Sequence, residues 1–94
     1  MQTIKILIID DDREICEYME LLLEQQGYEV HAETDPREGL DKLKEEEFHV
    51  VVLDIMMPEI NGMDALETIR NFDSDIAIII FTGYPSVDTA RTSM

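Results

Sequence analysis

The 94-residue chain has very few basic residues and a single cysteine. Lysine and arginine together number 7 against 22 aspartates and glutamates, which gives a formal net charge of −15. This balance argues against an electrostatic surface for nucleic acid or anionic membrane, and it favours divalent cations or basic partners. One cysteine, Cys16, allows neither an intrachain disulfide nor a thiolate metal cluster. Because it lies among apolar positions of helical spacing, we expect a buried thiol.

Long hydrophobic runs are also absent. No segment approaches the length of a membrane span. The apolar run at residues 4–9 is too short for a signal-peptide core and is followed by acid. These absences predict a cytoplasmic protein. With 45% apolar residues the chain can still form a real core, and its length predicts one small domain over residues 1–94.

Four short apolar runs predict strands. Residues 4–9, 50–53 and 76–81 are rich in Ile and Val, which is typical of parallel strands buried on both faces. Residues 28–32 alternate apolar and polar side chains and predict an edge strand.

Helical patterns fill the intervals between these runs. The first pattern ends at Gly27 and places four apolar side chains on one face, Ile15, Met19, Leu22 and Leu23. Asp12 directly precedes it, so we expect Asp12 to serve the helix terminus rather than to bind a ligand. Asp35 and Pro36 predict the start of a second helix.

A third helix is predicted at 63–71, and Ser86 is an N-cap for a fourth, in which the chain reaches residue 94. The glutamates at 45–47 predict a solvated helix end. The alternation of strands and helices predicts a doubly wound α/β domain with a parallel sheet and right-handed crossovers.

Acidic residues follow two of the predicted strands. Asp10 and Asp11 end the first strand, Asp54 ends the third, and Thr82 ends the fourth. Ligands of open α/β sheets bind outside the carboxyl ends of the strands. If the first and third strands are neighbours, three carboxylates converge there. Oxygen-only ligation suits Mg²⁺ or Mn²⁺, and both histidines lie away from this edge, so we do not expect zinc.

The segment after Asp54, LDIMMPEINGMD, extends this prediction. Pro58 and Gly62 lie in the loop that leads into the third helix and hold its backbone in an unusual path. The backbone carbonyl of Met56 can turn toward a metal. Beside a metal, the Asp54 carboxylate can act as a nucleophile toward a phosphoryl group. Thr82 can then donate a hydrogen bond to a phosphoryl oxygen.

Three segments, ILIIDDD, VVVLDIMMPEINGMD and FTGYPSVDTA, resemble the receiver domain of two-component response regulators. The D-x-x-M-P-x-x-x-G element is a specific signal, and the resemblance spans the whole chain. It implies a flavodoxin-like sheet with strand order 2-1-3-4. It also implies a signalling module rather than an enzyme. Such a module catalyses at most its own Mg²⁺-dependent phosphorylation and dephosphorylation.

The resemblance implies roles for single residues. Asp54 accepts a phosphoryl group from a sensor histidine kinase or a phosphotransfer protein. Asp10, Asp11 and Asp54 hold Mg²⁺ together with the backbone carbonyl of Met56.

Residues near the fourth strand also receive roles from the resemblance. Thr82 and Gly83 bind the phosphoryl group and switch the surface around the fourth helix. Met56 and Tyr84 tune the rate of dephosphorylation.

The chain departs from the family at one position. The family carries a lysine at the end of a fifth strand, and this chain ends before such a strand. Its lysines, Lys5, Lys42 and Lys44, are not expected at the carboxylate edge. We therefore expect a receiver truncated within its fourth helix and lacking the fifth strand and helix. The fourth strand would be an exposed apolar edge, open to self-association or domain swapping.

Two alternatives remain. Without the lysine, the chain can be a phosphorylation-incompetent receiver-like module that acts through protein association. An enzyme is the other alternative, but a magnesium phosphohydrolase would need a second aspartate where Met56 stands. A flavin-binding protein would need a Ser/Thr/Gly-rich phosphate loop where the three aspartates stand.

Overall fold

The computed structural model describes residues 3–54, 62–73 and 75–81. Strands and helices alternate along these residues, as the sequence predicts. The strands are β1 (Lys5–Ile9), β2 (Glu29–Glu33), β3 (Val50–Asp54) and β4 (Ala77–Phe81), and the helices are α1 (Arg13–Gln25), α2 (Pro36–Glu45) and α3 (Gly62–Phe72). No helix in this part of the chain is long and apolar enough to cross a membrane. The helix predicted after Ser86 lies outside the described residues.

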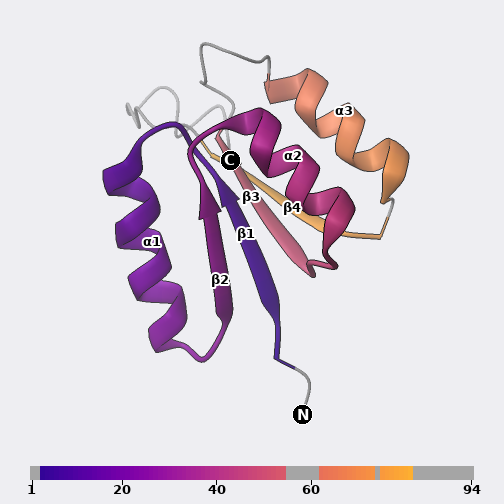
Figure 1. The fold of residues 1–94 in the computed structure, drawn as a ribbon. Coiled ribbons are helices and arrows are strands. Elements are labelled where there is room, and N and C mark those ends of the chain that lie inside the picture. The colour runs from indigo at the N-terminus through magenta and orange to yellow at the C-terminus, as the bar shows by residue number, and fades with distance from the viewer. Residues whose placement is uncertain (1–2, 55–61, 74, 82–94) are drawn as a thin grey trace.

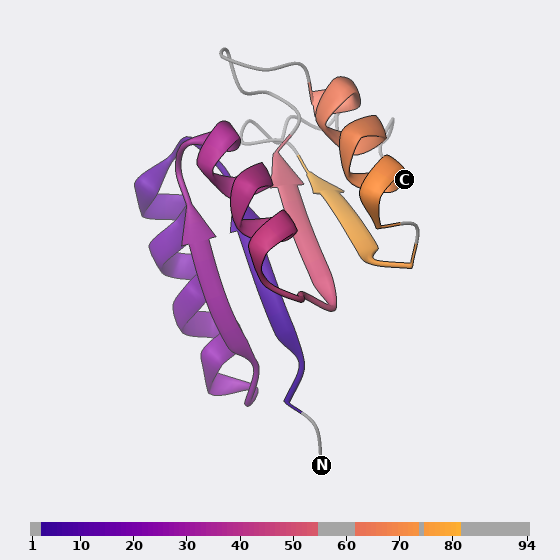
Figure 2. The ribbon, with the colours of Figure 1, turned by 45° about the vertical axis from the view of Figure 1, so that its right-hand side comes forward.

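The strands form one parallel sheet in the order β2-β1-β3-β4. The strands all run toward the same end of the sheet, as the arrows of β1 and β2 in Figure 1 and those of β3 and β4 in Figure 2 show. Helix α1 covers one face, and α2 and α3 cover the other, as both views show (Figures 1 and 2). The predicted doubly wound α/β fold with strand order 2-1-3-4 is confirmed. Since Ile9 pairs with Leu53, the residues that follow them lie side by side.

Two apolar clusters, one on each face of the sheet, hold these layers together. The cluster beneath α2 and α3 contains Leu7, Ile9, Leu43, Phe48, Val51, Leu53, Ala65, Ile69 and Ile76. The cluster beneath α1 contains Ile6, Ile8, Cys16, Val30 and Val52. Successive residues of a strand point to opposite faces, and both faces of β1 are covered. This double burial explains the apolar run at residues 6–9, in which each Ile or Leu contributes roughly 1.5–3 kcal/mol.

Aspartate side chains cap the first two helices. The Asp12 carboxylate accepts hydrogen bonds from the backbone N–H groups of Glu14 and Ile15, at 3.0 and 3.3 Å. The Asp35 carboxylate accepts one from the N–H of Arg37 at 2.9 Å. Each cap satisfies backbone donors that have no partner within the helix.

The apolar face predicted for α1 is only partly covered by the sheet. Cys16 is 3% exposed, which confirms the buried thiol, and Met19 and Leu23 pack against the cluster beneath the helix. Leu22, which the sequence places on the same apolar face, is 43% exposed. Consecutive helical residues are about 100° apart, and a sheet covers only one arc of a helix. The predicted stop at Gly27 is confirmed by its φ of +93°, which favours glycine.

Strand β4 forms one edge of the sheet within the described residues. Its Ile79 and Ile80 point to opposite faces and are 54% and 39% exposed. The expected exposed apolar strand is therefore confirmed for these side chains.

Helix α2 approaches β1 closely at Gly39. A Cβ atom added to this glycine would lie 2.8 Å from the Cδ1 and Cγ1 atoms of Ile9. Glycine therefore allows α2 to pack directly on the last residue of β1, next to Asp10.

Candidate functional site

Asp10, Asp11 and Asp54 lie together at the carboxyl ends of β1 and β3. Each contributes a carboxylate oxygen to a group whose members lie within 4.8 Å of one another. Asp10 is fully buried, Asp54 is 2% exposed, and Asp11 is open to solvent. The pairing of β1 with β3 brings the two buried carboxylates together, although 43 residues of chain separate them.

Asp10 is held by three hydrogen bonds. Its backbone N–H donates to the carbonyl of Glu33 at 3.2 Å, and its Oδ1 accepts from the N–H of Asp12 at 3.0 Å. Its carbonyl oxygen accepts from the Cys16 thiol, with an Sγ to O distance of 3.2 Å. The other carboxylate oxygen, Oδ2, is buried without a hydrogen-bond partner. Such an oxygen beside two more carboxylates indicates a ligand for a cation.

The pKa of Asp10 is raised from 3.8 to about 7. Burial is the largest cause, and the neighbouring Asp54 and Asp11 add to it, while the N–H of Asp12 opposes it. The site therefore disfavours the ionised form of Asp10 unless positive charge is present. A divalent cation would reverse this preference, because an opposite charge at short range stabilises a carboxylate.

The Cys16 thiol lies directly behind this group. Burial, with the charge of Asp10 adding to it, raises the pKa of the thiol to about 11. The thiol is therefore protonated at neutral pH and can donate to the Asp10 carbonyl. The sequence predicts its burial but gives no direct sign of this contact. The only signal is its position in the first turns of α1, where side chains point back toward the helix N-terminus.

The other residues implied by the resemblance have different outcomes. Asp12 caps α1, in agreement with its expected role at the helix terminus. Gly62 begins α3. The remaining predictions concern residues outside the described part of the chain, namely Met56, Pro58, Thr82, Gly83 and Tyr84.

Charged groups at the opposite end of the sheet are paired. The Nζ of Lys5 lies 2.7 Å from Oε1 of Glu46 and 3.8 Å from Oε2 of Glu29. It also lies 4.9 Å from the ring centroid of Phe48. The hydrogen bond with Glu46 raises the pKa of Lys5 and lowers that of Glu46. His31 lies 2.8 Å from Glu29, and this contact lowers the pKa of that glutamate.

The glutamates at 45–47 only partly match the predicted solvated helix end. Glu45 and Glu47 are exposed, but Glu46 is partly buried by its contacts with β1. Lys5 lies 41 residues away in the sequence, so the local charge run could not reveal this pair.

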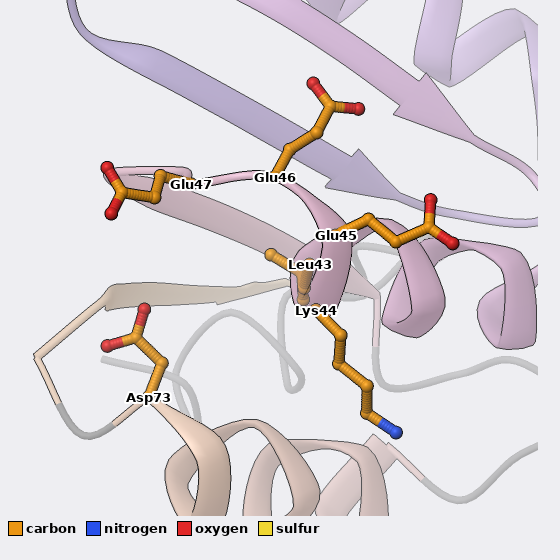
Figure 3. Close-up of a pocket in the computed structure, with 6 residues that line it drawn as sticks. All are labelled: Leu43, Lys44, Glu45, Glu46, Glu47 and Asp73. Carbon is orange, nitrogen blue, oxygen red and sulfur yellow. The ribbon is translucent and has the colours of Figure 1, made fainter.

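A pocket of about 310 Å³ lies beside this end of α2. It is lined by Leu43, Lys44, Glu45, Glu46, Glu47 and Asp73. Figure 3 shows the glutamates spread along the chain as it leaves α2, with Asp73 on the far side. Within the described ranges, the group of Asp10, Asp11 and Asp54 is the one in which three such side chains are close enough to hold a metal ion.

The three lysines are placed by these contacts. Lys5 is at the start of β1, and Lys44 lines the pocket at the end of α2. Lys42 lies 3.7 Å from both Glu33 and Glu46. Each interacts with or lies beside carboxylates other than those of Asp10, Asp11 and Asp54.

Comparison with known proteins identifies the family. A model of the response regulator receiver domain matches residues 6–94. The transcriptional regulatory protein ZraR of Klebsiella oxytoca is 37% identical over 89 residues, which cover 95% of this chain and 20% of ZraR. The chain thus spans about a fifth of the length of this relative.

Solved structures show the same fold. A CheY-like receiver domain protein from Methanospirillum hungatei JF-1 gives a TM-score of 0.85 at 34% identity, covering 98% of this chain and 74% of the other. TrrA from Thermotoga maritima, solved with Mg²⁺ and BeF, gives 0.83 at 33% identity, covering 97% and 78%. TrrA in complex with the histidine kinase ThkA gives 0.82 at 33% identity, covering 89% and 72%. The family match and the shared fold together show that this chain belongs to the response regulator receiver domain family.

Proposed function

We propose that this chain is a phosphoacceptor module that receives a phosphoryl group on Asp54, with Mg²⁺ bound by Asp10, Asp11 and Asp54. One observation carries the proposal: three carboxylates converge at the carboxyl edge of the sheet, and Asp10 Oδ2 has no protein partner. Membership of the receiver family and the likeness to TrrA solved with Mg²⁺ and BeF support it.

The donor set fits the metal. Mg²⁺ prefers oxygen ligands, binds through one or two carboxylates and keeps positions for water and phosphate. A buried Asp10, a buried Asp54 and an exposed Asp11 provide the carboxylates. When bound, Mg²⁺ would neutralise the charge on the transferring phosphoryl group. The Met56 carbonyl completes the protein ligands in this proposal.

In the reaction, a carboxylate oxygen of Asp54 forms a bond to phosphorus. The bond between phosphorus and the imidazole nitrogen of a phosphohistidine breaks at the same time, and the imidazole takes a proton from solvent. Asp10 and Asp11 would hold Mg²⁺ beside the nucleophile. Thr82 and Gly83 receive the phosphoryl oxygens and alter the surface near them, while Met56 and Tyr84 set the lifetime of the product.

The partner in this proposal is a sensor histidine kinase or a phosphotransfer protein in the cytoplasm. The complex of TrrA with a histidine kinase supports the first of these. The chain acts as a signalling module rather than as an enzyme with a separate substrate.

Incubation with acetyl phosphate and Mg²⁺ tests the proposal. We expect intact-mass spectrometry to show the addition of one phosphoryl group, and we expect chelation of the metal to prevent it. Asp54→Asn should remove the addition because the amide is a poor nucleophile. Asp41→Asn, at an exposed position of α2, is the matched control and should be modified like the unchanged chain.

Failure of the unchanged chain to gain mass would support the second candidate, a receiver-like module that acts through protein association. The observation that favours this candidate is the exposure of Ile79 and Ile80 on β4. Light scattering distinguishes it, since this candidate requires a dimer or larger assembly that forms without phosphorylation.

A further inference from the structure

The thiol of Cys16 donates a buried hydrogen bond to the main chain of Asp10, one of the proposed metal ligands. Its Sγ lies 3.2 Å from the carbonyl oxygen of Asp10. Cys16 is 3% exposed and Asp10 is fully buried. Water therefore has little access to this carbonyl, and the thiol is the group that satisfies it.

The contact acts where the chain turns from β1 into α1. Asp10 and Asp11 both lie in this short connection, and Asp12 already caps the helix. The N–H of Asp10 is bonded to Glu33 on β2, and its Oδ1 is bonded to the N–H of Asp12. The thiol holds the carbonyl of the peptide that joins Asp10 to Asp11.

The orientation of this peptide controls both carboxylates. A rotation of the peptide plane would turn the Asp10 side chain relative to β1 and would carry Asp11 with it. Outer groups that hold a ligand in one orientation commonly change metal affinity even though they do not touch the metal.

We propose that Cys16 is a positioning residue of the metal site, whose thiol holds the Asp10 carbonyl and thereby aims the Asp10 and Asp11 carboxylates at one divalent cation. This inference rests on the proposed function, because it requires a cation at that site. Cys16 itself is not a ligand.

Packing alone is the competing explanation. Cys16 also belongs to the apolar cluster beneath α1, so any smaller residue there would lower stability. Substitution by serine or alanine separates packing from hydrogen bonding. Both side chains are smaller than cysteine, but they differ from each other by one hydroxyl. Serine keeps a donor, and alanine does not.

Isothermal titration with Mg²⁺ alone tests the inference on the unchanged chain, Cys16→Ser and Cys16→Ala, with Asp10→Asn as the negative control. We expect Cys16→Ala to raise the Kd for Mg²⁺ roughly 5- to 10-fold. This effect is small for a residue that orients a metal ligand, because a thiol is a weak hydrogen-bond donor. We expect Cys16→Ser to remain within about twofold of the unchanged chain, because its hydroxyl can replace the donor.

The ¹³C chemical shift of the Asp10 carbonyl in the metal-free protein gives a second readout. It should move in Cys16→Ala and move much less in Cys16→Ser. Equal Kd values for the unchanged chain and Cys16→Ala would overturn the inference, as would equal weakening in both variants. If Cys16→Ala does not fold, Cys16→Val supplies an apolar side chain without a donor, and the same weakening is expected. Absence of Mg²⁺ binding by the unchanged chain would instead overturn the proposed function.

Discussion

The carboxylates at the two ends of the sheet have opposite pKa shifts. At the start of β1, the contact with Lys5 lowers the pKa of Glu46. The contact with His31, with Lys5 adding to it, lowers the pKa of Glu29. At the end of β1, the neighbouring carboxylates and burial raise the pKa of Asp10 to about 7. One end pairs its carboxylates with Lys5, whereas the other gathers carboxylates around a buried oxygen without a hydrogen-bond partner.

This contrast indicates which charges stabilise the fold and which serve a ligand. Ion pairs at the start of β1 need nothing beyond the protein itself. The carboxylates at the end of β1 destabilise the metal-free fold, because bringing like charges together costs free energy. In the proposed function, Mg²⁺ supplies the positive charge that offsets this cost. Four predictions test this division, from the largest expected effect to the smallest.

Asp10→Asn should have the largest effect and should act in two directions. It removes a ligand, so we expect Mg²⁺ binding to be lost at millimolar concentrations in calorimetric titrations. It also removes the buried charge, so we expect the metal-free protein to become more stable by on the order of a few kcal/mol at pH 8. Urea denaturation measures the second effect. A variant that is less stable than the unchanged chain at this pH would contradict our account of the carboxyl edge.

The pH dependence of metal-free stability should follow the pKa of Asp10. Its folded pKa of about 7 is above the unfolded value, so the folded state binds a proton that the unfolded state has released. This contribution to the free energy of unfolding is complete below about pH 4 and is lost as the pH rises toward 7. Urea denaturation of the unchanged chain and Asp10→Asn, compared at several pH values, isolates it. A constant difference between the two proteins would show that Asp10 does not titrate in this range.

Asp12→Ala should separate the third aspartate from the other two. The carboxylate of Asp12 caps α1, and alanine has no side-chain oxygen that can replace it. We therefore expect Asp12→Ala to lower the free energy of unfolding by about 1 kcal/mol. Asp12→Asn should recover most of that loss because its side-chain oxygen can still cap. Since Asp12 is outside the metal-binding group, Mg²⁺ affinity should change by less than about twofold in Asp12→Asn. A loss of binding as large as that of Asp10→Asn would place all three aspartates in one site.

Lys5→Met should have the smallest effect and should leave the metal site unchanged. It removes the contact with Glu46 and the cation over the Phe48 ring but keeps an apolar side chain of similar length. Surface ion pairs contribute little, so we expect a slightly lower Tm that becomes indistinguishable at high salt. A double-mutant cycle with Glu46→Gln measures the coupling. Any change in Mg²⁺ affinity would show that the two ends are not independent.

Features that depend on local pattern were predictable from the sequence. Asp12 and Asp35 precede apolar helical stripes, and both cap their helices. The ends of β1 and β3 were also predictable, because buried runs stop abruptly at Asp10 and Asp54, whereas the strand order came from the resemblance to the receiver family.

Features that depend on contact between distant segments were not. Asp10 and Asp11 are adjacent in the sequence and identical in type, yet one is buried and the other is exposed. Leu22 has the composition of a core residue, but its exposure depends on how much of α1 the sheet covers. The pair of Lys5 with Glu46 exists only because the end of α2 returns to the start of β1.

Gly39 limits how this protein can vary. Alanine normally favours a helix over glycine by about 1 kcal/mol, so an exposed helical glycine is easily replaced. Here the new methyl group would meet Ile9 at 2.8 Å, and Ile9 directly precedes Asp10. Selection for a more stable α2 would therefore disturb the residue beside the carboxylates. Glycine lowers the helix propensity of α2 but leaves Ile9 undisturbed. We therefore expect substitutions at this position to be rare.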